Sequence, residues 1–341
     1  MVFDAEFARP AEVDAQAATA VIAAMSSTAR GRSFGRLTDA AAFMAACQGK
    51  VPAEPLRQPR VVIFYGHEDG NADAANDIAA GSAPVATLAR THGAGVRVEE
   101  IPTDDSALQF GSAIADSEID AGADLLIPGE LGEGFSTEAA ALFGALTKTE
   151  PVALASLDTS LTTQQWQRDV AAIRDHMFRC CTAHAAPLEL LTESGTPAAQ
   201  ALVGFILQAT TRRTPVLIDG CFATVCGLMA EKIAPGTRAW LYSSQLSPEP
   251  AHILAVQKLE LTPMLAFDLS TGQGTGGVLA LSALNAAIEL VSDEVYAITE
   301  AINAQSDSNA TRATEPKPRS TESNATELST AEPNSSVAKD A

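Results

Sequence analysis

Four short runs of β-branched and other apolar residues recur along the chain, separated by longer stretches with a different pattern. The runs cover residues 61–66, 96–98, 124–129 and 215–220. Apolar runs of this length, bounded by turn residues, are typical of buried strands. The first, third and fourth runs end at a glycine, so we expect these strands to lead into glycine-containing loops.

Alanine-rich stretches with apolar residues at helical spacing lie between and after these runs. They cover residues 136–147, 166–185, 198–211, 222–233 and 277–304, and they are longer than strands usually are. Strands that alternate with helices predict an α/β fold, in which a mostly parallel, wound sheet has helices on both faces. Ligands in such folds bind beyond the carboxyl ends of the strands, so the glycine loops are the expected site.

The two ends of the chain differ from this central core, which we place at residues 51–276. Residues 1–50 contain no strand pattern, and we expect a small helical unit there that packs with a long helix over 277–305. From 306 to 341 the chain is rich in Ser, Thr, Asn, Glu and Pro and has almost no large apolar residues. Such a segment cannot offset the entropy of ordering its backbone, so we predict a disordered tail.

The charge balance and the cysteines limit the partners and the compartment. The chain has 42 acidic against 22 basic residues, whereas nucleic-acid binding depends on clustered Lys and Arg, so we expect no nucleic-acid partner. We also expect no export and no membrane span, because there is no basic and apolar leader and no run of about 18 uninterrupted apolar residues. The cysteines show no CxxC spacing, which favours a reducing cytoplasm and no metal or other cofactor.

Residues 129–140, Gly-Glu-Leu-Gly-Glu-Gly-Phe-Ser-Thr-Glu-Ala-Ala, join the third predicted strand to a helix. Gly132 and Gly134 permit a ligand to approach the backbone closely, and Ser136 or Thr137 is placed to cap the helix. The free amides and the positive dipole end of that helix favour a phosphate. Glu133 and Glu138 in the same segment oppose this binding, because their carboxylates repel a phosphate.

Three further segments form an ordered set of motifs with residues 129–140. They are Arg-Gly-Arg-Ser-Phe-Gly-Arg-Leu at 30–37, Pro-Val-Leu-Ile-Asp-Gly-Cys at 215–221, and the paired stretches 243–252 and 269–277, which end in Leu-Ser-Thr-Gly-Gln-Gly-Thr-Gly-Gly. In this order and spacing, the set resembles the nicotinate-nucleotide:dimethylbenzimidazole phosphoribosyltransferase family of the cobalamin pathway. The resemblance covers the chain from about Arg30 to Thr299.

The resemblance implies a reaction and its substrates. It implies that the chain transfers phosphoribose from nicotinate mononucleotide to dimethylbenzimidazole or a related azole, which gives α-ribazole phosphate and nicotinate. It also implies a homodimer. In the family, a glutamate of the last motif is thought to take the azole proton. Here that position is Gln273, and a neutral amide cannot accept a proton at neutral pH.

The motifs also indicate the remaining candidate site residues. Glu130 directly follows a predicted strand, where it can contact the ribose hydroxyls or replace the missing base. Asp219 ends another strand at the same edge of the sheet, although a simple turn residue is the alternative. His252 matches a family histidine, although a packed helical histidine is the alternative. We further expect substrate contacts from the loop around Gln273, through Gly272, Gly274, Thr275 and Gly276.

Two functions stay open on this basis. In the first, the chain is an active phosphoribosyltransferase in which Gln273 and Glu130 are the catalytic residues. In the second, it is a catalytically impaired paralogue that binds a nucleotide or an azole, or that partners an active homologue. A scaffold without a ligand is a third, weaker interpretation, which requires closed glycine loops.

Overall fold

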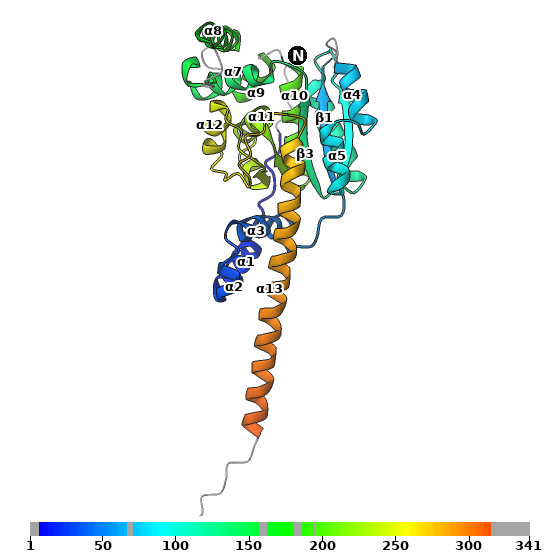
Figure 1. Ribbon diagram of the computed structural model, residues 1–341, viewed down its shortest axis with the longest axis vertical. Helices are drawn as coiled ribbons and strands as arrows, with labels where there is room; N and C mark the ends of the chain where they lie inside the picture. The colour runs from blue at the N-terminus through cyan, green and yellow to red at the C-terminus, as the bar shows by residue number, and fades with distance from the viewer. Residues whose placement is uncertain (1–6, 67–70, 157–161, 181–185, 194–195, 315–341) are drawn as a thin grey trace, which may run out of the picture. The chain divides into compact units, whose positions relative to one another are not determined.

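The computed structural model describes residues 7–66, 71–156, 162–180, 186–193 and 196–314. At the centre of this part of the chain lies a sheet of five parallel strands in the order β2-β1-β3-β4-β5 (Figure 1). The strands are β1 (Pro59–Tyr65), β2 (Gly95–Glu100), β3 (Leu125–Leu131), β4 (Val216–Ile218) and β5 (Leu241–Ser243). The predicted α/β class and the four predicted strands are confirmed. The pattern missed β5, because a strand of three residues is too short to form a recognisable run.

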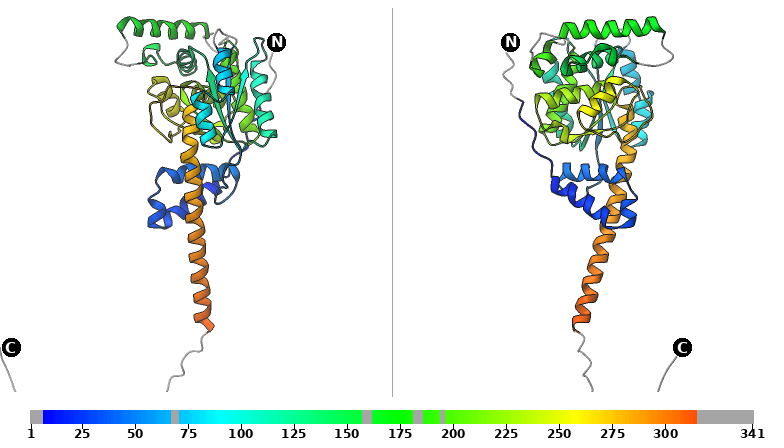
Figure 2. Two further views of the ribbon diagram at one scale, coloured as in Figure 1. Left: turned by 45° about the vertical axis from the view of Figure 1, so that its right-hand side comes forward. Right: turned by 90° about the vertical axis from the view of Figure 1, so that its left-hand side faces the viewer.

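Helices join these strands and cover both faces of the sheet (Figures 1 and 2). They are α4 (Asn71–Ala79), α5 (Pro84–Thr91), α6 (Ala107–Asp120), α7 (Phe135–Thr147), α8 (Thr163–Cys180), α9 (Pro187–Glu193), α10 (Pro197–Thr211), α11 (Gly220–Ile233), α12 (Pro250–Lys258) and α13 (Thr275–Thr314). The five predicted helical stretches correspond to α7, α8, α10, α11 and α13. The last part of the second stretch, 181–185, lies outside the described residues.

Alternate residues of β1 face two separate hydrophobic cores. Val62 and Phe64 are fully buried in a core with α6, α7, α10 and α11. Val61 and Ile63 are fully buried in a second core with α4, α5 and α13. This is the two-residue period of a strand that is covered on both faces, and it explains why residues 61–65 of β1 are continuously apolar.

Three N-terminal helices pack beside the first part of α13 (Figure 2). They are α1 (Ala15–Ser27), α2 (Ala29–Arg32) and α3 (Arg36–Gln48). Val21 of α1 and Leu284 of α13 are fully buried in the same core. Glu294 of α13 accepts a hydrogen bond of 2.7 Å from the hydroxyl of Thr28 and lies 3.2 Å from the guanidinium of Arg30. Apolar packing and this buried carboxylate therefore hold the N-terminal helices on α13.

The last helix is longer than its sequence pattern indicated. α13 begins at Thr275 and continues past residue 306, where we placed the start of a disordered tail, to Thr314. The helical residues 306–314 correct that boundary, and the rest of the predicted tail, 315–341, lies outside the described residues. The contacts along the chain divide it into two compact units, Met1–Ile298 and Thr299–Ala341.

One stretch of the described residues is long and apolar enough to cross a membrane. It is Thr275–Ala304 in α13, and 56% of the most apolar 18 residues of this stretch is buried inside the protein. Val278, Leu281 and Leu284 of this stretch pack in the core that α13 shares with the N-terminal helices. A role as a core helix accounts for its apolar composition.

Candidate active site

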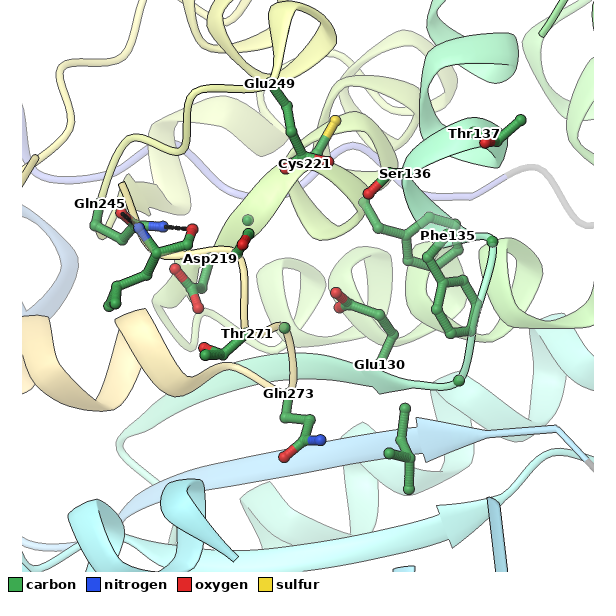
Figure 3. Close-up of a pocket in the computed structure, with 18 residues that line it drawn as sticks. Glu130, Phe135, Ser136, Thr137, Asp219, Cys221, Gln245, Glu249, Thr271 and Gln273 are labelled. Atoms are coloured by element: carbon green, nitrogen blue, oxygen red, sulfur yellow. Dashed lines mark hydrogen bonds between the residues drawn. The ribbon is translucent and has the colours of Figure 1, made fainter. Parts of the chain in front are cut away.

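A cavity of about 310 Å³ opens at the carboxyl ends of β3, β4 and β5, the place where wound α/β sheets bind ligands. The first turns of α7 and α11 and the loop before α13 complete its wall (Figure 3). Its lining residues are Glu130, Leu131, Gly132, Gly134, Phe135, Ser136, Thr137, Asp219, Gly220, Cys221, Phe222, Gln245, Glu249, Leu269, Ser270, Thr271, Gly272 and Gln273.

Close packing of two backbone segments forms one side of this cavity. A Cβ atom on Gly129 would lie 2.4 Å from the carbonyl carbon of Gln273, so only glycine lets β3 approach the loop before α13 so closely. The amide N–H of Gln273 donates a hydrogen bond of 3.1 Å to the carbonyl oxygen of Glu130. The two residues are thereby neighbours, but Figure 3 shows the Gln273 amide turned away from the carboxylates of Glu130 and Asp219.

Glu130 is a buried acid that no cation among the described residues compensates. The residue is 9% exposed, and its Oε2 atom has no hydrogen-bond partner among the described residues. Burial, followed by the nearby carboxylates of Asp219, Glu249 and Glu138, holds the pKa of Glu130 well above its usual range. A carboxyl group of this kind keeps its proton to a higher pH than an exposed glutamate does.

The raised pKa of Glu130 predicts a pH-dependent stability. The folded state favours the protonated carboxyl, so this contribution to stability is fully present below the unfolded pKa of about 4.3 and is lost as pH rises through the folded pKa. Above that unfolded pKa, we therefore expect the free energy of unfolding of the wild type to fall relative to that of Glu130→Gln. Urea unfolding at a series of pH values measures the difference, with the exposed neighbour variant Glu133→Gln as control. Parallel pH profiles for wild type and Glu130→Gln would show that no buried carboxyl titrates here.

Asp219 holds the start of α13 in place. Its Oδ2 atom accepts a hydrogen bond of 2.8 Å from the amide of Gly276, and its Oδ1 atom accepts one of 2.8 Å from the hydroxyl of Ser244. Burial raises the pKa of Asp219, and these hydrogen bonds oppose that rise. Because both carboxylate oxygens are engaged within the protein, Asp219 shapes the cavity wall.

The start of α7 differs from its predicted form. The helix begins at Phe135, and its N-cap residue is Gly134, which has a left-handed conformation with a φ of 82°. No side chain caps the helix, so the prediction that Ser136 or Thr137 caps it is wrong. Glycine reaches this conformation without strain and starts the helix alone, and Ser136 and Thr137 line the cavity from the first turn.

Four polar residues of the cavity wall were missed in the sequence, Ser270 and Thr271 in the loop before α13 and the two residues Gln245 and Glu249. Gln245 binds the loop before α13 through Leu269, donating to its carbonyl oxygen at 2.9 Å and accepting from its amide at 3.3 Å. Glu249 is the N-cap residue of α12, and its carboxylate accepts a hydrogen bond of 2.8 Å from the hydroxyl of Ser247. Both residues belong to the motif at 243–252, so their motif positions were the signal that could have identified them.

His252 lies behind the cavity wall. It is fully buried, and its Nδ1 atom lies 2.7 Å from the hydroxyl oxygen of Ser247, which also contacts Glu249. Burial lowers the pKa of His252 to about 4, so the ring is neutral at physiological pH. His252 therefore supports Ser247 and Glu249 from behind and does not line the cavity.

Most of the predicted site residues meet at this one cavity. Those that line it are Glu130, Gly132, Gly134, Ser136, Thr137, Asp219, Gly272 and Gln273. Like His252, residues 274–276 (Gly274, Thr275 and Gly276) do not line it. The glycine at 276 instead allows close packing, because a Cβ atom there would lie 2.4 Å from the Oδ1 atom of Asp219. Among the described residues, no group of three or more His, Cys, Asp or Glu side chains is arranged to hold a metal ion.

The wound parallel sheet and the strand-end cavity with its buried acids define an α/β protein with a small-molecule site. Comparison with known proteins identifies its family. A family model described as phosphoribosyltransferase matches residues 10–106 and 103–301. The chain belongs to this phosphoribosyltransferase family, which confirms the resemblance seen in its motifs.

Named relatives agree with this assignment. The nicotinate-nucleotide–dimethylbenzimidazole phosphoribosyltransferase of Corynebacterium efficiens is 38% identical over 300 residues, which cover 76% of this chain and 82% of that protein. The protein of the same name from Mycobacterium avium is 37% identical over 331 residues, which cover 84% of this chain and 95% of that protein. A crystal structure with this name from Thermus thermophilus has a TM-score of 0.74 at 27% identity, covering 82% of this chain and 96% of that one.

Proposed function

We propose that this chain transfers phosphoribose from nicotinate mononucleotide to dimethylbenzimidazole or a related azole, releasing nicotinate and forming α-ribazole phosphate. Family membership supports phosphoribosyl transfer, and the names of the relatives support the two substrates. The observation that carries the proposal is the state of Glu130, a buried carboxyl with an elevated pKa in the strand-end cavity.

The reaction requires a proton acceptor beside the azole. One azole nitrogen attacks the anomeric carbon of the ribose while the bond from that carbon to the pyridinium nitrogen breaks, and nicotinate leaves with the bonding electrons. Positive charge develops on the ribose, and carboxylates near it stabilise this state. The azole N–H passes its proton to Glu130, whose raised pKa makes its carboxylate a stronger base than that of an exposed glutamate.

The nucleotide then has a defined orientation in this proposal. We place its phosphate against the amides of Gly132–Thr137, where α7 begins, and its ribose beside Glu130. The backbone of Gln273 lies next to Glu130, and its side chain holds the azole by hydrogen bonds after rotating from the orientation in Figure 3 toward the cavity. Crystals soaked with nicotinate mononucleotide test this arrangement, and phosphate density elsewhere, with this loop empty, would contradict it.

Because Glu130 is the base in this account, a carboxylate at position 273 is not needed. Gln273→Glu is expected to change turnover by less than about fivefold, or to lower it, since two neighbouring carboxylates repel each other and raise one pKa. The measurement is nicotinate release for wild type and Gln273→Glu at equal azole saturation. A rise of about 10² or more would instead make residue 273 the site of the missing base.

Nicotinate release with and without dimethylbenzimidazole tests the proposed function. We expect release that depends on the azole and is strongly reduced in Glu130→Gln. The replacement of the family glutamate by Gln273 supports a second candidate, a catalytically impaired paralogue that binds a nucleotide or azole or partners an active homologue. Tight binding of either substrate without nicotinate release would favour that paralogue.

We propose a cytoplasmic homodimer that acts on small molecules without a metal or organic cofactor. The low basic content and the free cysteines support this form, and dimerisation follows the family resemblance. Analytical ultracentrifugation of the full chain tests the dimer, and a monomer at micromolar concentration would contradict it.

A further inference from the structure

Among the residues that the structure describes, none with a cationic side chain lines the cavity. None of its lining residues is Lys, Arg or His, whereas three are acids: Glu130, Asp219 and Glu249. The internal segments outside the described residues, which are 67–70, 157–161, 181–185 and 194–195, contain no Lys or Arg, and their only histidines are His67 and His184. A dianionic phosphate in this cavity therefore meets several carboxylates and no side-chain counter-ion from its wall, and like charges repel.

Acids also accompany the helix starts that would otherwise attract an anion. Helix N-termini bind anions through free amides and a positive dipole end, and α7, α11 and α12 all begin beside this cavity. α7 has Glu138 in its first turn, Asp219 is the N-cap residue of α11, and Glu249 is the N-cap residue of α12. These carboxylates reduce the positive potential that a phosphate requires.

The rest of a pyridinium nucleotide suits this wall better than its phosphate does. Carboxylates accept hydrogen bonds from ribose hydroxyls, and they attract the positively charged pyridinium ring. Glu130 lines the cavity, and its buried Oε2 atom has no partner among the described residues, so a small rotation of the side chain lets it accept such a hydrogen bond. The chemistry of the wall thus matches a pyridinium riboside, with or without the 5′-phosphate.

We propose that the site accepts pyridinium ribonucleosides as donors, with a kcat/KM within about tenfold of that for the corresponding nucleotide. This inference rests on the proposed transfer to an azole. The azole nitrogen forms a bond to the anomeric carbon of nicotinate riboside, and the bond from that carbon to the pyridinium nitrogen breaks. Nicotinate leaves with the electron pair, and the azole N–H proton passes to Glu130. The product is a ribosyl azole without phosphate.

The test compares nicotinate mononucleotide and nicotinate riboside as donors to dimethylbenzimidazole, using the full chain and measuring nicotinate release. We expect the two kcat/KM values to agree within about tenfold. A preference of more than about 100-fold for the nucleotide overturns the inference and leaves the proposed function intact. If neither donor releases nicotinate, the proposed function fails instead. Calorimetry then tests the inference by measuring the Kd of each donor. Similar Kd values for nicotinate riboside and nicotinate mononucleotide support it, and binding of the nucleotide more than about 100-fold tighter overturns it.

A cation added to the cavity rim should create the phosphate preference that the wild type lacks. Ser270 is exposed and lines the cavity, so Ser270→Arg adds a charge without disturbing the core. We expect the nucleotide-to-riboside ratio of kcat/KM to rise about tenfold at low salt and to fall again as added salt screens the charge. Ser270→Gln, the uncharged matched control, should leave the ratio unchanged. An unchanged ratio in Ser270→Arg would contradict the electrostatic argument.

Discussion

Replacing Glu130 by glutamine is expected to lower kcat by about 10² to 10⁴, the usual contribution of a general base. The amide keeps the size of the side chain but cannot take the azole proton. Because burial and neighbouring acids raise the pKa of Glu130, kcat/KM of the wild type should also increase as pH rises through that pKa. The measurement is azole-dependent nicotinate release between about pH 5 and 9.

The decrease in kcat should occur only when the buried carboxyl of Glu130 is replaced. Glu133→Gln removes a neighbouring acid that is exposed and does not line the cavity, so it should retain the wild-type rate and pH profile. Glu130→Gln should lack the increase of kcat/KM with pH while still binding the azole. An equal loss in both variants, or an unchanged pH profile in Glu130→Gln, would rule out Glu130 as the base.

Replacing Asp219 by alanine is expected to lower the free energy of unfolding by about 3 kcal/mol, because two buried donors lose their acceptor. These donors are the amide of Gly276 and the hydroxyl of Ser244, each 2.8 Å from a carboxylate oxygen. The same change releases the start of α13 and with it the loop that carries Gln273, so activity should fall even in the folded fraction. Urea unfolding and nicotinate release measure the two effects.

Two variants separate the hydrogen bonds from the charge of Asp219. Asp219→Asn keeps one acceptor oxygen, and Ser244→Ala removes only one of the two donors, so each should lower the free energy of unfolding by about 1 kcal/mol. If Asp219→Asn lowers the free energy of unfolding as much as Asp219→Ala does, the charge itself stabilises the start of α13. A negligible loss in Asp219→Ala would show that the carboxylate is not needed there.

The wound sheet was predictable because its strands are covered on both faces. The run at 61–66 is continuously apolar, since Val61 and Val62 enter opposite cores, and the same holds for the other long strand at 124–129. β5 was not predictable, because Leu241–Ser243 is a strand only through its pairing with β4, which depends on tertiary structure. The helical continuation through 306–314 was also missed, because polar composition favours disorder but does not exclude a helix.

The candidate site was predictable where a motif contains the residue that reaches the cavity. Glu130 was identified because it directly follows a predicted strand, and Gln273 because it occupies the position of the family glutamate in the last motif. His252 was assigned to the substrate because motif position alone does not show depth, and the structure places it behind Ser247. Contacts such as those of Asp219 with α13 join segments far apart in the sequence, and only folding reveals them.

The most direct test of the account follows both products in one incubation of the full chain with nicotinate mononucleotide and dimethylbenzimidazole. Proton NMR distinguishes free nicotinate from a ribosylated azole and reports the configuration at the anomeric carbon. The account predicts equal amounts of nicotinate and α-ribazole phosphate, formed only when both substrates are present. Nicotinate released without a ribosylated azole, or no conversion of either substrate, would contradict it.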